Sequence, residues 1–405
     1  MSNDLKNSFN KFNLVRLDNQ NALRNVESRQ PLNIQIDGRN YELNLAPRDL
    51  RTASYRAEAT AADGVRSLQR AAVTTFRGTI AGESDSQVRL TIDAEKIEGY
   101  FTTTRGERFF IEPARNYSRL AGAQDLIVYR EKDLLRTADF VCESELGKKI
   151  KRGEETVVAN RFQSMPTYRV LELATEADFA FVTELGGAAQ ANNEILNILN
   201  LIEGNYETEL GLTFDVVFQH AWTTADPFDA PTASSFLNSF RNYWNANRPQ
   251  STVPRDAAHL FTSRQIFNGR GLSYVGTICA NPNSAYGFTG RLDVGTIKYV
   301  LTAHEIGHNF NANHVDAAQG CDNTIMTSVV SNLTPVDFCE YSRAEITNFV
   351  TANSSCLTPR ASNSTRFDFD GDGKADESVF RPANGIWYVL RSALGFTGVA
   401  FGLPT

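Results

Sequence analysis

Residues 304–314 read HEIGHNFNANH, and this stretch decides how the rest of the chain is interpreted. It holds three of the five histidines of the chain, namely His304, His308 and His314. His304 and His308 are one helical turn apart, so they project from the same side of a helix. Glu305 follows the first histidine on the same turn. Two imidazoles and a carboxylate grouped in this way are a metal-binding pattern, which a third imidazole would complete.

Imidazole nitrogens are preferred ligands of zinc, and a nearby carboxylate can take a proton from a water molecule whose pKa the metal lowers. We therefore predict a zinc ion bound by His304, His308 and His314, with Glu305 as the general base. A straight helix would carry His314 about 9 Å further along the axis than His308, beyond reach of the metal. The sequence thus predicts a sharp turn at Asn311, a residue type that tolerates left-handed backbone. The alternative is an HExxH pattern that arose by chance on an amphipathic helix.

The pattern HExxHxxxxxH followed by Met326 resembles the metzincin peptidases, whose pattern is HExxHxxGxxH with a Met-turn. The neighbouring stretches GLSYVGTIC, HEIGHNF and CDNTIM are similar to the reprolysin (adamalysin, ADAM-like) branch, over roughly residues 165–357. Two departures stand out. Asn311 occupies the family's glycine position, and Val315 separates the third histidine from Asp316, which leaves the supporting role of that aspartate open.

The resemblance implies a fold, an activity and a substrate class. The fold is an α/β (α+β) catalytic domain, with a mixed twisted sheet, helices and a zinc cleft, preceded by a β-rich pro-domain as in bacterial members. The activity is that of a secreted zinc metalloendopeptidase made as a latent proenzyme, acting on proteins or peptides. The alternative is a catalytically silent, calcium-binding adhesion protein that uses a peptidase-like scaffold.

The resemblance also implies two disulfides, Cys279 with Cys356 and Cys321 with Cys339. Cys142 then remains unpaired, just before a basic stretch. Its thiolate could occupy the zinc position that water needs, which would keep the enzyme latent. The competing interpretation is a buried free cysteine without a role.

Three segments are expected along the chain. A β-rich pro-domain and linker would span residues 1–150, and the Asp37-Gly38 pair between alternating apolar residues predicts a hairpin in it. The polar residues 143–160 would form a connector or a maturation cleavage site. The catalytic domain would span residues 160–357, where strands alternate with helices. Residues 358–405 would form a linker and a partial repeat.

Within the catalytic segment, His220 and His259 fall in apolar strands and are expected to be structural. The family resemblance also implies that residues 286–289 form the sheet edge that pairs with an extended substrate.

The C-terminal stretch FDFDGDGKADESVFRP resembles the FG-GAP/VCBS repeats of secreted bacterial proteins. Oxygen ligands at loop positions one, three, five, seven and nine match a calcium site. Position twelve is Val379 instead of Glu, which disfavours an EF-hand. The alternative is a solvated acidic turn. The predicted calcium ligands are Asp368, Asp370, Asp372, Lys374 through its carbonyl, and Asp376.

Composition limits the partners. The net charge of −7 gives no general attraction to nucleic acid, and no apolar run is long enough to span a membrane. We expect a monomer. The first residues, MSNDLKNSFNKF, show no secretory signal, although oxidised cysteine pairs would imply export.

Overall fold

The structure is a computed structural model that describes residues 1–135, 139–142, 167–228, 230–264, 270–290, 296–361, 376–382, 384–391 and 395–400. The chain divides into two units. The first comprises Met1–Arg161 with Val170–Thr358, and the second comprises Phe162–Arg169 with Pro359–Thr405. The domain boundaries near residues 150 and 358 remain predictions.

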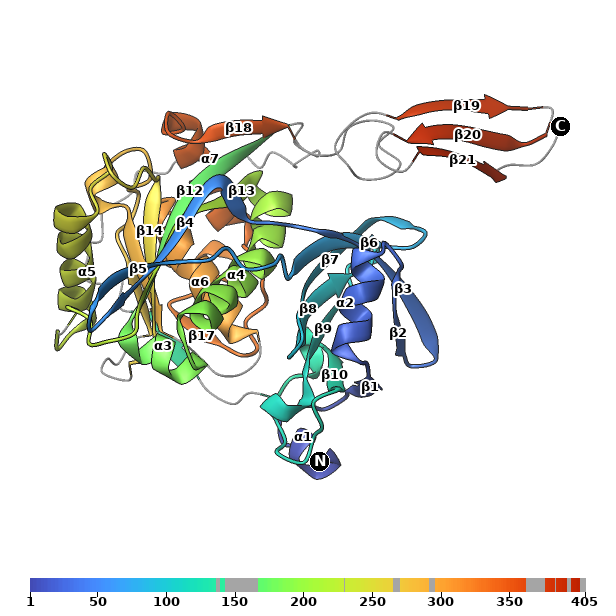
Figure 1. The fold of residues 1–405 in the computed structure, drawn as a ribbon, viewed down its shortest axis with the longest axis horizontal. Coiled ribbons are helices and arrows are strands. Elements are labelled where there is room, and N and C mark those ends of the chain that lie inside the picture. Colours follow the sequence, from blue (N-terminus) through green and yellow to red (C-terminus); the bar gives the residue numbers. More distant parts are fainter. Residues whose placement is uncertain are drawn as a thin grey trace. The chain divides into compact units, whose positions relative to one another are not determined.

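An antiparallel sheet dominates the N-terminal part of the first unit (Figure 1), and its strands follow the order β1-β10-β9-β8-β7-β6-β3-β2. The predicted hairpin is formed by β2 and β3, with Asp37 and Gly38 at φ 50° and 80° in the turn. These positive angles are what a tight two-residue hairpin requires. The elements are α1 (Ser2–Leu5), β1 (Asn13–Arg16), α2 (Asn19–Glu27), β2 (Leu32–Ile36), β3 (Arg39–Pro47), β6 (Thr75–Ile80), β7 (Glu83–Ile92), β8 (Ile97–Thr102), β9 (Arg108–Pro113) and β10 (Asp125–Arg130).

The helix with the histidine motif packs against a second sheet. Seven strands of this sheet follow the order β15-β16-β14-β12-β13-β4-β5. Parallel pairs join β12 with β14, β14 with β16, and β13 with β4, whereas β15 is antiparallel to β16. The strands are β4 (Arg51–Ala61), β5 (Gly64–Leu68), β12 (Thr167–Ala177), β13 (Leu212–Trp222), β14 (Ala257–Thr262), β15 (Gly271–Ser273) and β16 (Tyr286–Gly290).

Helices cover both faces of this sheet. Leu171 and Leu173 of β12 pack in one apolar cluster with α4 and α6. The next residue of the strand, Ala174, packs in a separate cluster with α5. Alternate side chains of a strand point to opposite faces, so α5 lies on the other side from α4 and α6, as Figure 1 shows. The helices are α3 (Phe179–Leu185), α4 (Ala188–Asn205), α5 (Ala233–Asn247), α6 (Ile297–Asn309) and α7 (Glu340–Ala352), with short turns η1 (Ala114–Asn116), η2 (Glu131–Asp133), η4 (Tyr206–Leu210), η5 (Pro282–Ser284) and η6 (Ala317–Gln319).

The hairpin β4–β5 departs from the expected organisation. Sequence alternation predicts a single N-terminal β domain, but this hairpin leaves the N-terminal sheet and extends the second sheet beyond β13 (Figure 1). The parallel register aligns Phe218 with Arg56 and Trp222 with Thr60. Alternation in a strand tells which side chains are buried, but it does not tell which partner strand covers them.

The predicted substrate edge is also displaced. Strand β16 is hydrogen-bonded on both sides, to β14 and to β15, so residues 286–289 are not an edge. The edge of the sheet at this end is β15.

A small sheet joins two distant segments of the first unit. Strand β11 (Asp139–Val141) pairs antiparallel with β17 (Val329–Ser331). The amide of Cys142 continues this pairing by donating to the carbonyl of Ser328 at 3.0 Å.

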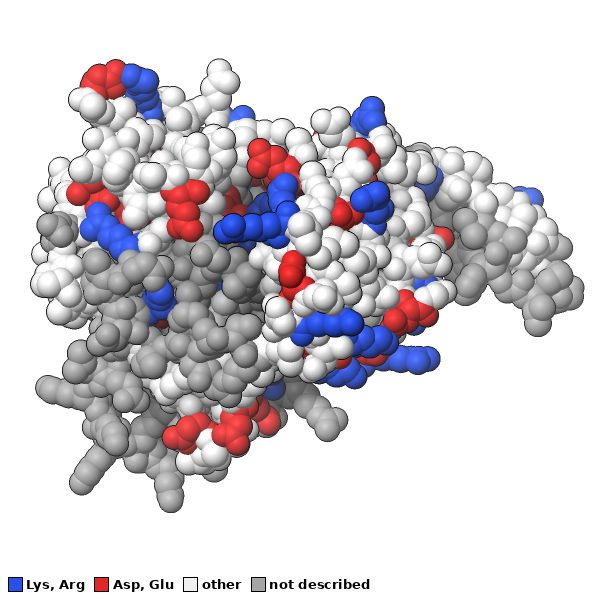
Figure 2. Space-filling model, turned by 90° about the horizontal axis from the view of Figure 1, so that it is seen from below, with Lys and Arg blue, Asp and Glu red and all other residues white. Residues whose placement is uncertain are grey.

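Strand β18 (Thr358–Ala361) begins at the last residue of the first unit. The second unit contains an antiparallel sheet of three strands, namely β19 (Glu377–Arg381), β20 (Ile386–Arg391) and β21 (Gly395–Ala400). Over the described residues of the whole chain, no helix has the length and apolar character needed to cross a bilayer. Acidic and basic side chains are interspersed on the face that Figure 2 shows.

Candidate metal centre

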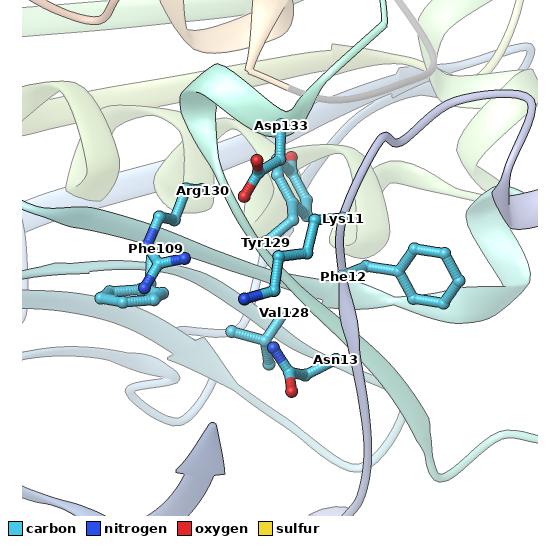
Figure 3. Close-up of a pocket in the computed structure, with 8 residues that line it drawn as sticks. All are labelled: Lys11, Phe12, Asn13, Phe109, Val128, Tyr129, Arg130 and Asp133. Carbon is cyan, nitrogen blue, oxygen red and sulfur yellow. The ribbon is translucent and has the colours of Figure 1, made fainter. Parts of the chain in front are cut away.

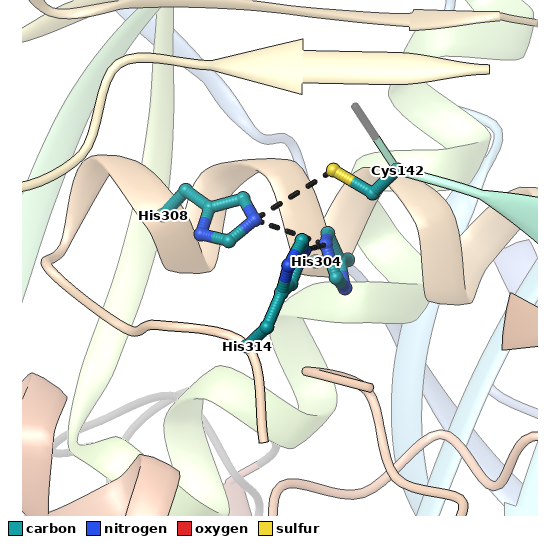
Figure 4. A group of neighbouring side chains, drawn as sticks. All are labelled: Cys142, His304, His308 and His314. Atoms are coloured by element: carbon teal, nitrogen blue, oxygen red, sulfur yellow. Dashed lines mark hydrogen bonds between the residues drawn. The ribbon is translucent and has the colours of Figure 1, made fainter. Parts of the chain in front are cut away.

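Helix α6 presents the first two histidines of the motif. It ends at Asn309, and the chain then reverses, with Asn311 in the left-handed region at φ 70°. The amide of Asn311 donates to the carbonyl of His308 at 2.8 Å, which closes the turn. The reversal brings His314 back to face the two histidines of the helix, as Figure 4 shows.

The three imidazoles converge through their Nε2 atoms. His304 Nε2 lies 3.0 Å from His308 Nε2 and 3.2 Å from His314 Nε2. Two nitrogens bound at 2.0–2.1 Å to one tetrahedral zinc ion would be about 3.3 Å apart. The observed separations are close to that value, so the three residues fit a zinc ion.

Backbone carbonyls fix the orientation of the two helical imidazoles. His304 Nδ1 lies 2.6 Å from the carbonyl of Ile325, and His308 Nδ1 lies 2.7 Å from the carbonyl of Ala312. A carbonyl only accepts, so each Nδ1 carries the proton and each Nε2 directs its lone pair toward the centre. Burial and the neighbouring imidazoles lower the pKa of His304 well below its ordinary value, and the same causes lower that of His308 to about 3. Neutral imidazoles are the form that binds zinc.

Glu305 is fully buried beside this group, and its Oε2 atom has no hydrogen-bond partner among the described residues. Burial raises the pKa of this carboxyl to about 8. The carboxylate packs against Gly271 of β15, where a Cβ atom would overlap it. A carboxyl with a raised pKa and a free oxygen is suited to accept and return a proton.

Met326 lies beneath the helix and is fully buried. A Cβ at Gly307 would lie 2.8 Å from its sulfur, so the methionine packs directly against the backbone of α6. The Met326 carbonyl accepts the amide of Val315 at 3.1 Å, which ties the returning strand to this segment. Asp316 does not join the site, because its side chain accepts the amide of Ala318 and caps η6.

Cys142 reaches the same centre from the N-terminal side. Its Sγ lies 3.3 Å from Glu305 Oε1 and 3.8 Å from His308 Nε2, and Figure 4 shows it pointing at the histidines. One ligand atom from each of Cys142, His304, His308 and His314 lies within 4.8 Å of the others. The cysteine is buried and is not part of a disulfide.

Two disulfides join Cys279 to Cys356 and Cys321 to Cys339. These are the pairs that the family resemblance implies. The shorter of the two connections brackets the Met326 segment, and both are consistent with an extracellular, oxidising compartment.

Asp368, Asp370, Asp372 and Lys374 lie outside the described residues, and Asp376 is buried directly before β19. Calcium binding therefore stays a prediction.

A shallow hollow elsewhere in the first unit is unrelated to the histidines (Figure 3). Its lining residues come from the segment after α1 and from β1, β9, β10 and η2: Lys11, Phe12, Asn13, Phe109, Val128, Tyr129, Arg130 and Asp133.

Sequence reasoning missed the groups that orient the site. The carbonyls of Ile325 and Ala312 belong to the backbone, which has no signature in a sequence. Gly271 was visible in the GLSYVG stretch, but nothing there indicates that Glu305 rests on it. The pairing of β4 with β13 was not predictable either, because alternation in a strand does not reveal its partner strand.

The geometry defines a site of the metallopeptidase type, and comparison with known proteins supports the same class. Residues 167–365 match the family model Reprolysin_5, described as metallo-peptidase family M12. This match supports a metallopeptidase family for that part of the chain. Metallopeptidases of this family use zinc, and the histidine group fits that metal.

Two solved structures are similar to the chain at low identity. One is entitled "Structure of a chaperone-substrate complex", with 12% identity, a TM-score of 0.37, and coverage of 47% of this chain and 35% of that chain. The other is "Crystal Structure of metalloproteinase-II from Bacteroides fragilis", with 10% identity, a TM-score of 0.44, and coverage of 86% and 94%. Neither likeness is close enough to carry an argument about function.

Proposed function

We propose that the protein is a secreted zinc metalloendopeptidase of the metzincin type, made as a latent proenzyme. The observation that carries this proposal is the convergence of three imidazole Nε2 atoms beside a buried carboxyl whose Oε2 has no hydrogen-bond partner among the described residues. Three imidazole ligands leave one position of a tetrahedral zinc ion open, which is the arrangement of catalytic zinc sites.

The histidines would bind the metal, and Glu305 would transfer protons. A zinc ion held by His304, His308 and His314 supplies Lewis acidity when bound, which makes water acidic and polarises a carbonyl group. Glu305 takes the proton of the attacking water at its carboxylate and delivers it to the amine that leaves.

Hydrolysis tests this proposal directly. Because Cys142 occupies the site, we use the full chain with Cys142→Ala and measure cleavage of denatured casein. We expect Glu305→Gln to reduce cleavage about 10²–10⁴-fold without loss of bound zinc. Glu340→Gln, an exposed glutamate on α7, is the matched control and should leave cleavage unchanged. Cleavage that survives a zinc chelator or the loss of Glu305 would contradict the mechanism.

Latency follows from the position of the Cys142 thiol. A thiolate within reach of the histidines is a zinc ligand of the preferred kind, and it would fill the position that water needs. The competing interpretation, a buried cysteine without a role, predicts no bond to the metal. We expect the cobalt-loaded chain to show thiolate-to-metal absorption that Cys142→Ser abolishes, and Cys142→Ser to raise cleavage in the uncut chain. Equal spectra in the two proteins would rule out the thiolate ligand.

A further inference from the structure

We infer that residues 1–135 form a permanent, non-covalent subunit of the peptidase, and that only β11 with Cys142 acts as a removable plug. A cut in residues 143–166 would then give a two-chain enzyme instead of releasing the N-terminal segment. The regulatory meaning of this inference rests on the proposed function, but the association of the two chains does not.

The first support is the shared sheet. Strand β4 pairs with β13 over most of its length. Backbone hydrogen bonds extend the contact at both ends, from Val216 N to Leu50 O at 2.7 Å and from Thr223 N to Thr60 O at 2.9 Å. Side chains reinforce this contact, since Thr60 Oγ1 lies 2.8 Å from His220 Nε2 and Tyr55 donates to Gln219 at 2.7 Å. Loss of the hairpin would turn β13 into an open edge with buried residues along it.

The second support is a set of buried ion pairs that cross between the two segments. Glu203 of α4 is fully buried and pairs with Arg48 at 2.6 Å and with Arg89 at 2.9 Å. Arg89 also contacts Glu207. Burial alone would raise the pKa of Glu203, but the two guanidinium groups hold it at about 2. Without the N-terminal segment, this carboxylate would be left buried or newly solvated without a cation.

A similar cluster lies nearer the zinc helix. Glu98 of β8 contacts Lys298 of α6, and Lys96 contacts Glu194 of α4. Arg108 of β9 pairs with Asp337 at 2.7 Å. The catalytic segment supplies most of the acids and the N-terminal segment most of the bases, so the two surfaces are complementary in charge.

The third support is a common apolar core. One cluster of buried side chains combines residues of both segments, among them Leu50, Tyr100 and Phe110 with Ile198 and Leu212. The shared apolar cluster, the strand pairing and the ion pairs together resemble an obligate interface, so we expect the two segments to stay together after the chain between them is cut.

The plug has a shorter strand pairing with the catalytic segment than β4 has. Strand β11 has three residues and pairs only with β17 in the described part of the chain. A cut beyond Cys142 makes this strand a chain end, and chain ends with few backbone contacts fray. Activation then requires the plug to leave the metal, while the body of the segment stays bound.

The inference is tested by cleaving the folded chain and measuring whether the two fragments dissociate. A recognition sequence for a site-specific protease replaces residues within 143–166, and the digested protein is analysed by size-exclusion chromatography without denaturant. We expect both fragments to elute together. With Cys142→Ala, the two-chain species should also cleave casein, and an inactive but co-eluting complex would count against the proposed function alone.

Charge variants test the interface itself. Arg48→Ala with Arg89→Ala should increase the dissociation constant of the cut complex on the order of a hundredfold, because a buried carboxylate loses both cations. Arg39→Ala is the matched control, since Arg39 pairs with Glu83 within the N-terminal segment. Arg108→Gln is a milder variant if the double variant does not fold. Separation of two folded fragments from the digested wild-type chain would overturn the inference.

Discussion

Gly271 shows how one residue without a side chain sets the position of the carboxyl group that moves protons. The carboxylate of Glu305 lies so close to it that a methyl group would overlap the acid. We predict that Gly271→Ala, in the Cys142→Ala background, lowers kcat about 100-fold, because a small displacement of a reacting group is costly. Zinc content should stay unchanged in metal analysis. Gly398→Ala is the control, because its Cβ would meet only ordinary contacts at 3.5 Å or more.

His259 makes the stability of the fold depend on pH. Burial lowers the pKa of this imidazole to about 3, and its Nε2 lies 2.7 Å from Thr289 Oγ1. The unfolded chain takes up a proton near pH 6.5, whereas the folded chain does not, so stability is full above pH 6.5 and falls as pH drops toward 3.

The substitution His259→Gln should remove this contribution. We predict that the unfolding free energy of the wild type falls by about 2 kcal/mol more than that of the variant between pH 7 and pH 5. Urea unfolding at the two pH values measures the difference. Parallel losses in the two proteins would mean that the imidazole is not responsible.

At the scale of elements, the end of α6 decides whether the third histidine returns. Asn311 adopts φ 70°, which glycine accepts freely and a β-branched residue resists. We predict that Asn311→Gly keeps zinc affinity, whereas Asn311→Val weakens it about tenfold, since left-handed backbone costs about 1–2 kcal/mol. Competition with a chromophoric chelator measures the affinity. A valine variant that binds zinc as tightly as the glycine variant would refute the idea.

Elements governed by local rules were predictable. The histidine helix follows from apolar spacing, the β2–β3 turn from Asp37-Gly38, and the chain reversal from an asparagine where a straight helix would fail. Elements governed by distant partners were not. The β-rich character of the N-terminal segment is visible in the sequence, but the pairing of β4 with β13 depends on residues far along the chain. Likewise, nothing local to residues 286–289 reveals that β15 covers their open side.

For the molecule as a whole, the two disulfides should contribute unequally. They link residues 77 and 18 positions apart, and a longer closed loop restricts the unfolded chain more. We predict a loss of about 4.5 kcal/mol for Cys279→Ser with Cys356→Ser, and of about 3 kcal/mol for Cys321→Ser with Cys339→Ser. Guanidinium unfolding of both variants gives the comparison. Equal losses would indicate that strain or residual structure outweighs loop length.

The pairing of β4 with β13 has a consequence for the newborn chain. Thr60 and His220 touch across 160 positions, and a ribosome needs roughly 10 to 30 s to make that length. Throughout this interval the β4–β5 hairpin lacks its partner strand β13. An exposed edge strand can pair with the same strand of another nascent chain, which leads to aggregation. Strand β4 carries three charged residues, Arg51, Arg56 and Glu58. Such charges disfavour pairing between chains until β13 has been synthesised.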